Sequence, residues 1–260
     1  MSAIGVFDSG VGGLTVVSAL RRILPSQPIL YLGDTARLPY GTKSSATVER
    51  YAERNVRFLV ERDVKGVVIA CNTASAVALP HLKAGLPLWG VVEPGAARAA
   101  AVSKGRVGVI ATESTIASGA YERALHRQRA DLEVFSLACP LFVPLVEEGW
   151  HADPVTRQIA ERYLTPLLDD GIDTLVLGCT HYPLLRPLLQ EVVGPGVTLV
   201  DSADSVAARV ADDLDPEHLT EHDAPGAATF FVTDAARRFA RIGRAILGDD
   251  SLELELVDVH

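Results

Sequence analysis

Short apolar runs of strand length alternate along this chain with longer segments whose apolar positions follow helical spacing. The apolar runs predict strands at residues 4–7, 28–32, 88–92, 132–137, 197–200, 229–232 and 252–259, with three more beginning at 66, 106 and 173. Helical spacing predicts helices at residues 14–24, 47–62, 157–168, 205–214 and 234–247, and one more beginning near Asn72. Strands that alternate with helices are typical of an α/β fold with mainly parallel sheets.

The second half of the chain repeats the pattern of the first. VGVIATE, which contains Thr112, is similar to IGVFDSG, which contains Asp8, and LVLGCTHY is similar to VVIACNTA. Asp8 precedes Cys71 by 63 residues, and Thr112 precedes Cys179 by 67. We therefore expect two similar α/β domains related by a pseudo-two-fold axis, with the active site in the cleft between them. The predicted first domain is 1–97 plus 208–260 and the second is 98–207, with an acidic surface loop at 212–226.

Two cysteines stand at the ends of predicted strands. Cys71 closes the run GVVIAC and Cys179 closes DTLVLGC, and small polar residues follow both. Ligands of open α/β sheets bind at the carboxyl ends of the strands, so both thiols are candidate site residues. The third cysteine, Cys139 in LACPLF, is expected to be a small buried hydrophobe. An odd number of cysteines in a chain of this size argues against a disulfide framework and for a reducing compartment.

Charge and hydropathy exclude several classes of partner. The net charge of −9 gives no basic field for a nucleic acid or an anionic membrane surface. No apolar run reaches the ~18 residues of a membrane span, and no basic segment precedes an apolar one at the N-terminus. A hydrophobic content of 48% over 260 residues is ample for a core. We expect a cytoplasmic protein with a small-molecule substrate.

Paired thiols allow three kinds of chemistry. A cysteine nucleophile needs an orienting histidine, and Cys179 with His181 two positions later is a poor local match that leaves Cys71 unused. A zinc site of Cys71, Cys179 and His181 is possible, but C-x-H is not a usual ligand spacing. Two thiols on opposite sides of a cleft suit proton removal from one face of a carbon and proton return to the other, which is racemisation or epimerisation.

The turn after the first strand contains Gly10, Gly12 and Gly13, and a helix follows. Such a turn presents backbone N–H groups to an anion, although SGVGGLT supplies only half of the dinucleotide fingerprint. The polar loop GDTARLPYGTKS follows the second strand and is a further candidate, because loops at strand ends often carry function.

These segments together resemble the cofactor-independent aspartate/glutamate racemases. The resemblance covers nearly the whole chain, through GVFDSGVGGLTV, YLGDTARLPYGTKS, ACNTASA, CPLFVPLVEEG, LGCTHYPLL and FFVTDAARRFARIGRAILG. It implies interconversion of L- and D-glutamate for peptidoglycan synthesis, without a cofactor or metal, in a chain that forms a homodimer. The CNT and CTHYPL contexts favour glutamate by this resemblance only.

The resemblance also implies roles for single residues. Cys71 and Cys179 match the two catalytic acid/bases, Asp8 and His181 match the groups that assist the thiols, and Glu147, next to Glu148, matches an acid of the second half. The positions that match substrate-binding residues are Asp8, Ser9, Tyr40, Gly41, Asn72, Thr73, Thr180 and His181.

Other functions stay open on the sequence alone. An aspartate or hydantoin racemase shares the two-thiol pattern, and a non-catalytic protein that binds acidic amino acids shares the cleft but needs no thiols. A pyridoxal-phosphate racemase needs a Schiff-base lysine, and no lysine stands in such a setting: the lysines are Lys43, Lys65, Lys83 and Lys104.

Overall fold

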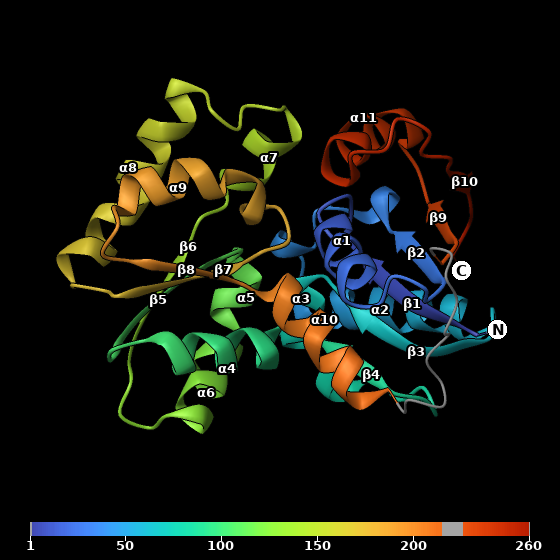
Figure 1. Cartoon of the computed structure of the whole chain (residues 1–260), viewed down its shortest axis with the longest axis horizontal. Coiled ribbons are helices and arrows are strands. Elements are labelled where there is room, and N and C mark those ends of the chain that lie inside the picture. The colour runs from blue at the N-terminus through green and yellow to red at the C-terminus, as the bar shows by residue number, and fades with distance from the viewer. Residues whose placement is uncertain (1, 215–225, 260) are drawn as a thin grey trace.

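Two parallel sheets form the centre of two α/β lobes (Figure 1). The structure is a computed structural model, and it describes residues 2–214 and 226–259. In the first sheet the strand order is β10-β9-β2-β1-β3-β4, and in the second it is β6-β5-β7-β8. The strands are β1 Ala3–Asp8, β2 Ile29–Gly33, β3 Val64–Ile69, β4 Leu88–Gly90, β5 Arg106–Ala111, β6 Glu133–Ala138, β7 Thr174–Gly178, β8 Thr198–Asp201, β9 Ala228–Val232 and β10 Glu255–Leu256. All pairings between these strands are parallel, which agrees with the mainly parallel sheets that the sequence predicts.

Helices cover both faces of each sheet. The helices of the chain are α1 Leu14–Ile23, α2 Ser45–Val60, α3 Asn72–Val77, α4 Val92–Val102, α5 Glu113–Ala117, α6 Ala120–Gln128, α7 Phe142–Glu147, α8 Pro154–Asp169, α9 Arg186–Val193, α10 Ser202–Asp213 and α11 Ala236–Leu247. In the first lobe α2 and α3 pack on one face, and α1, α10 and α11 pack on the other. In the second lobe α4 and α6 lie opposite α7, α8 and α9.

Four consecutive strands of the first sheet correspond one by one to the strands of the second sheet. β2-β1-β3-β4 and β6-β5-β7-β8 have the same order, so β1 matches β5 and β3 matches β7. β1 and β7 are buried along their whole length, as expected for strands between two helical layers. Equivalent positions at the carboxyl ends of the two sheets therefore carry Cys71 and Cys179. The two similar halves that the sequence predicts are confirmed by this topology.

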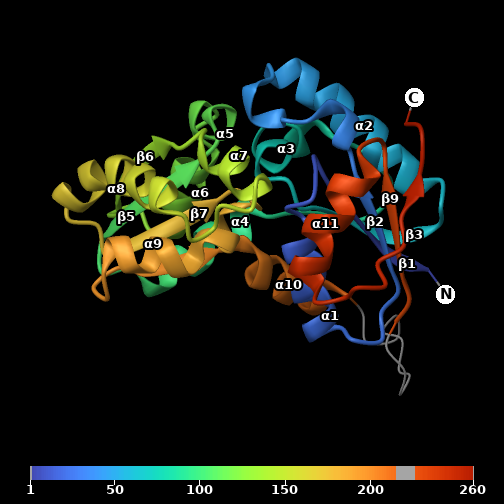
Figure 2. The same ribbon diagram turned by 90° about the horizontal axis from the view of Figure 1, so that it is seen from above.

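Two helices connect the lobes. The chain leaves the first sheet after β4 through α4 and returns from the second sheet after β8 through α10. The boundaries predicted at 97/98 and 207/208 fall inside these helices, and they remain a prediction. Figure 2 shows the lobes side by side, with α11 returning to the first lobe.

Three details differ from the sequence prediction. The last strand is only Glu255–Leu256 instead of 252–259, because β10 pairs with β9 at two positions only. The predicted strand at 88–92 ends at Gly90, since α4 already begins at Val92. Most of the predicted loop at 212–226 lies outside the described residues, and its first two positions belong to α10. Within residues 2–214 and 226–259, no helix is both long enough and apolar enough to cross a bilayer.

Candidate active site

A small cavity lies where the carboxyl ends of β1, β3 and β7 meet between the lobes. Its volume is about 30 Å³. Every predicted site residue except Asp8 lines it, and the other lining residues are Gly10, Leu38, Pro39, Thr112 and Val143. The first lobe contributes Cys71 and the second contributes Cys179, both almost fully buried. The fold thus brings the two strand-end thiols to one polar cavity.

Cys71 lies in a largely uncharged part of the cavity. It follows β3 by two residues and is the N-cap residue of α3. Its Sγ donates a weak hydrogen bond to Ser9 Oγ at 3.7 Å. Burial, and secondly the negative charge of Asp8, raise the pKa of the Cys71 thiol to about 12. Cys71 is therefore a neutral thiol at neutral pH.

Cys179 begins a chain of ionisable groups. Its Sγ lies 3.9 Å from His181 Nδ1, and His181 Nε2 lies 3.2 Å from Glu147 Oε1. Burial opposes protonation of His181, but its hydrogen bonds to Cys179 and Glu147 and the charges of Cys179 and Asp8 outweigh burial and raise its pKa to about 10. His181 is therefore an imidazolium at neutral pH, so it can donate a proton to a Cys179 thiolate but cannot accept one.

Glu147 faces the cavity and Glu148 faces solvent. Burial raises the pKa of Glu147, but the hydrogen bond from His181 and the charges of His181 and Arg238 more than offset it, so the pKa lies below its ordinary value. Glu147 is buried and Glu148 is exposed because they stand at the end of the short helix α7, where adjacent residues point to different sides. This removes the ambiguity of the glutamate pair, although the role of Glu147 stays a prediction.

Asp8 lies behind the cavity wall and joins the two lobes. Its carboxylate accepts hydrogen bonds from the Gly10 N–H at 2.9 Å and from Thr180 Oγ1 at 3.2 Å. Burial raises the pKa of Asp8, and the positive charge of His181 and these hydrogen bonds only partly counter it. Among the described residues Asp8 has no hydrogen bond to Cys71, so it acts on this thiol through its charge.

Tyr40 and Gly41 reach the cavity because a buried aspartate holds their loop. The Tyr40 hydroxyl donates to Asp34 Oδ2, and Asn55 Nδ2 donates to the same hydroxyl at 3.0 Å. Asp34 is fully buried and also accepts from Thr233 Oγ1 at 3.1 Å. Burial, together with the charge of Asp34, raises the pKa of Tyr40. Asp34 therefore anchors the loop that forms one wall of the cavity.

Two supporting groups of the second lobe were not among the predicted site residues. Thr112 lines the cavity, and its Oγ1 lies 3.0 Å from Thr73 Oγ1. Tyr121 is buried, donates to Asn72 Oδ1 at 2.5 Å and lies 3.0 Å from Ser202 Oγ. The repeat already places Thr112 at the position of Asp8, which is a signal for its place in the site. Tyr121 is the second residue of α6, and only the tertiary structure brings it to Asn72.

Two glycines lie where the backbone of the first lobe comes close to side chains of the second. A Cβ added at Gly12 would lie 2.4 Å from Thr180 Oγ1 and 2.7 Å from His181 Nδ1, and one at Gly41 would lie 2.6 Å from Thr112 Cβ. Real Cβ atoms do not make such contacts, so both glycines are required by the close approach of the opposite lobe. The sequence indicated Gly12 as part of an anion-binding turn, and the structure adds this steric reason.

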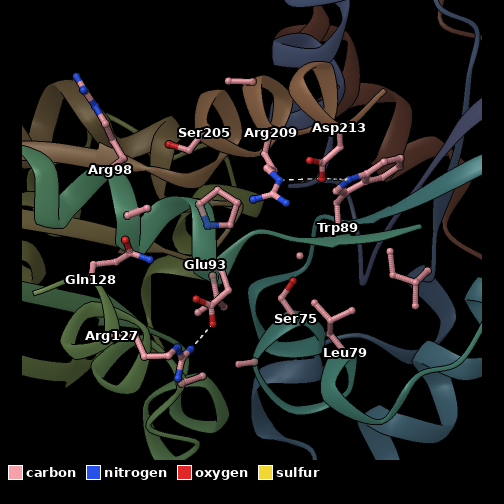
Figure 3. Close-up of a pocket in the computed structure, with 18 of the residues that line it drawn as sticks. Ser75, Leu79, Trp89, Glu93, Arg98, Arg127, Gln128, Ser205, Arg209 and Asp213 are labelled. Atoms are coloured by element: carbon pink, nitrogen blue, oxygen red, sulfur yellow. Dashed lines mark hydrogen bonds and ion pairs between the residues drawn. The ribbon is translucent and has the colours of Figure 1, made fainter. Parts of the chain in front are cut away.

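A larger cavity of about 1080 Å³ lies beside the two connecting helices, and none of the three cysteines lines it (Figure 3). Four of its charged side chains are paired with each other. Arg127 pairs with Glu93, while Asp213 pairs with Arg209 and accepts from the Trp89 indole. The polar residues that follow the carboxyl ends of the strands line the small cavity instead. The small cavity is therefore the candidate active site.

Metal ligands do not cluster in the part of the chain that the structure describes, since no group of three or more His, Cys, Asp or Glu side chains could hold an ion there.

Cys139 is fully buried in the core of the second lobe, which confirms its prediction as a small buried hydrophobe.

The fold and the site define a two-lobed α/β protein in which each lobe brings one strand-end thiol to a shared polar cavity. Residues 14–210 match the Asp/Glu/hydantoin racemase family, and the chain belongs to this family.

Proteins named glutamate racemase are similar to the chain over nearly its full length. The protein of Geobacter metallireducens is 53% identical, over 95% of this chain and 93% of its own. The protein of Neisseria meningitidis serogroup A is 49% identical, over 98% and 96%. The fold of a Francisella tularensis glutamate racemase, solved in complex with D-glutamate, matches with a TM-score of 0.92 at 37% identity, over 99% of this chain and 98% of the other. An aspartate racemase of Picrophilus torridus shares the fold, with a TM-score of 0.58 at 15% identity, over 82% of this chain and 94% of the other.

Proposed function

We propose that this chain is a glutamate racemase that interconverts L- and D-glutamate through two thiols, without a cofactor. The observation that carries the proposal is the placement of Cys71 and Cys179, one from each lobe, at a single cavity. The family assignment and the relatives at 45–53% identity support glutamate as the substrate. The structures named aspartate racemase share only the fold at 14–15% identity.

The proposed reaction moves one proton at each face of Cα. The thiolate of one cysteine takes the Cα proton, so the Cα–H bond breaks and an S–H bond forms. The thiol of the other cysteine then gives its proton to the opposite face, which restores a C–H bond with inverted configuration and leaves that sulfur as the thiolate. The reverse direction uses the same groups in exchanged roles, so the enzyme needs no external oxidant or reductant.

The residues around the two thiols assist proton transfer and bind the substrate. His181 exchanges a proton with Cys179, and Glu147 holds the charge and orientation of His181. Asp8 acts near Cys71 through its charge. The polar side chains Ser9, Asn72, Thr73 and Thr180 bind the amino and carboxylate groups of the substrate. In the described part of the chain no Lys or Arg lines the cavity, so uncharged donors and His181 must hold the carboxylates.

We also place the reaction in the cytoplasm, where it would supply D-glutamate for peptidoglycan, and we propose that the protein acts as a homodimer. Bacterial relatives named glutamate racemase, which match over 93% and 96% of their own lengths, support the first part. For the second, three large apolar side chains that are about half exposed lie close in sequence on the second lobe: Leu141, Trp150 and Val155. Light scattering of purified protein tests the homodimer, and a monomer at working concentration would contradict it.

Circular dichroism of single enantiomers tests the function. L-glutamate and D-glutamate, each incubated with the protein, should lose their signal to the same racemic end point, without added pyridoxal phosphate and after treatment with a chelator. L- and D-aspartate should react far more slowly. Faster aspartate turnover would favour an aspartate racemase, and binding of glutamate without loss of signal would favour a binding protein. About one zinc per chain, lost together with activity, would assign Cys71, Cys179 and His181 to a metal site.

A further inference from the structure

An arginine of the first lobe binds the glutamate that orients His181 in the second. Arg238 Nη2 on α11 lies 3.1 Å from Glu147 Oε2 and 3.1 Å from Glu148 Oε1. Arg241, one helical turn later, donates from Nη2 to the backbone oxygen of Glu147 at 3.2 Å. α11 packs on α1 of the first lobe, whereas α7 belongs to the second. Both contacts therefore cross from lobe to lobe at the same residue.

The contact extends a line of polar groups from the thiol to the solvent. Cys179 meets His181, His181 meets Glu147, and Glu147 meets Arg238. Side-chain exposure rises along this line, from 6% at His181 to 11% at Glu147 and 47% at Arg238. Glu147 lines the cavity and Arg238 binds it from the more exposed side, while the cavity, at about 30 Å³, is too small for an amino acid.

Arg238 also changes the charge balance around Glu147. The charged and titratable groups that face this carboxylate are His181 after β7, Arg238 and Arg241 on α11, and Glu148 beside it. Cys179 and Asp8 lie one step further, against His181. Each oxygen of Glu147 has its own partner, since Oε1 faces His181 and Oε2 faces Arg238. Two different partners fix the plane of the carboxylate, which one partner alone would leave free to rotate.

We propose that Arg238 is a positioning residue that holds Glu147 against His181, and that Arg238 and Arg241 form an interlobe latch, which must open to admit substrate and close before proton transfer. The inference rests on the proposed function, because it assigns the latch to the thiol partner of that same reaction. When the lobes come together, Arg238 and Arg241 bind Glu147, and Glu147 is then held against His181 on the Cys179 side of the site. Substrate held between open lobes would therefore lack the His181–Glu147 pair in its working geometry.

Variants of α11 test the proposal. Arg238→Gln should lower kcat about tenfold in both directions, and Arg238→Lys should recover most of the loss because it keeps the charge. The acid limb of the kcat profile should move to higher pH in Arg238→Gln, since the guanidinium helps to keep the pKa of Glu147 low. Arg237→Gln is the matched control: this neighbouring arginine is exposed and has no ion pair within residues 2–214 and 226–259.

A double-mutant cycle separates positioning from a general effect on the fold. In the Glu147→Gln background Arg238→Gln should cost less than about twofold, because the charged carboxylate that it holds is gone. An equal loss in both backgrounds, an unmoved acid limb, or the same loss in Arg237→Gln would overturn the proposal.

A titration that needs no turnover keeps the two proposals separate. The Glu147 carboxyl, followed by carbon NMR in the wild type and in Arg238→Gln, should show a higher pKa in the variant. If the wild type does not racemise glutamate, the proposed function fails and this titration still reports whether Arg238 controls Glu147. If the wild type is active and the Glu147 titration is identical in both proteins, the latch fails alone.

Discussion

The two thiols occupy equivalent positions in the two sheets, yet their surroundings differ. Cys71 has a weak hydrogen bond with Ser9 Oγ and one with the Ala74 backbone N–H, and the nearby charges that act on it are those of Asp8 and Cys179. Cys179 has a charged imidazole at 3.9 Å, and a carboxylate and a guanidinium follow it in line. The two halves of the fold thus place their thiols at equivalent positions, but the side chains next to the two thiols are different. In the proposed reaction, Cys179 exchanges a proton directly with His181, whereas Cys71 has no such ionisable hydrogen-bond partner among the described residues.

The largest effect should come from the thiols. Cys71→Ser and Cys179→Ser should each lower racemisation by about 10⁴-fold or more, since a serine hydroxyl is too weak a base at neutral pH. Elimination of HCl from a β-chloro analogue of glutamate needs one proton abstraction only, so each variant should retain it for one enantiomer. If both variants process the same enantiomer, the assignment of one thiol to each face is wrong.

Variants of Asp8 and His181 should distinguish proton transfer at Cys71 from proton transfer at Cys179. Asp8→Asn and His181→Asn should each cost about 10²- to 10⁴-fold in rate. The ratio of the two kcat/KM values is fixed by an equilibrium constant of one, so the asymmetry must be sought in kcat and in the isotope effect of each enantiomer deuterated at Cα. The two variants should shift these effects in opposite senses. Equal isotope effects in both directions for both variants would leave Asp8 and His181 as substrate-positioning residues.

The close approach of the lobes can be tested at the first glycine turn. Gly12→Ala should lower kcat/KM about 100-fold, because its Cβ would push Thr180 and His181 away and displace the Cys179 side by a fraction of an ångström or more. Gly10→Ala is the control in the same turn, where the nearest atom to an added Cβ, Leu38 Cδ2, is 3.6 Å away. Steady-state kinetics of both variants measure the loss in kcat/KM, and thermal unfolding measures any loss of stability. Equal losses would mean that the turn itself, and not the contact between lobes, is sensitive.

The smallest effect concerns stability at alkaline pH. The pKa of Cys71 is raised from 9.0 to about 12 in the folded protein. This stabilising contribution is complete below pH 9 and is lost as pH rises toward 12, at about 1.4 kcal/mol per pH unit at most. Denaturant unfolding between pH 8 and 11 should therefore show a shallower decline for Cys71→Ser than for the wild type. Parallel curves would show that Cys71 ionises as easily in the folded chain as in the unfolded one.

Periodicity and strand-end position were sufficient to predict much of the molecule. Buried parallel strands are continuous apolar runs, so β1, β3, β5 and β7 were visible in the sequence, and the cysteines that follow β3 and β7 marked the site. The correspondence of Asp8 and Thr112 predicted the repeated topology that the strand orders confirm.

Other features depend on long-range contacts that no local pattern contains. α7 was not predicted because Pro140 and Pro144 interrupt its apolar run, although a proline in the first turn of a helix loses no hydrogen bond. The choice between Glu147 and Glu148 depends on the orientation of that helix against α11. Asp34 resembled a loop residue, and its burial follows from Tyr40 in the same loop and from Asn55 and Thr233, which lie further away in sequence.

The shared strand order of the two sheets has a consequence for chirality. A pseudo-two-fold axis is a rotation, whereas L- and D-glutamate are related by reflection. Rotation about an axis in the plane of a deprotonated Cα exchanges the two faces and brings the thiols to opposite sides, but it also exchanges the positions of the amino and carboxylate groups. Two identical halves would therefore present the wrong partners to one end of the substrate. A chain built by repetition can serve both hands only if its halves diverge around the thiols, and the line from His181 to Arg238, without an equivalent contact to Cys71 among the described residues, is such a divergence.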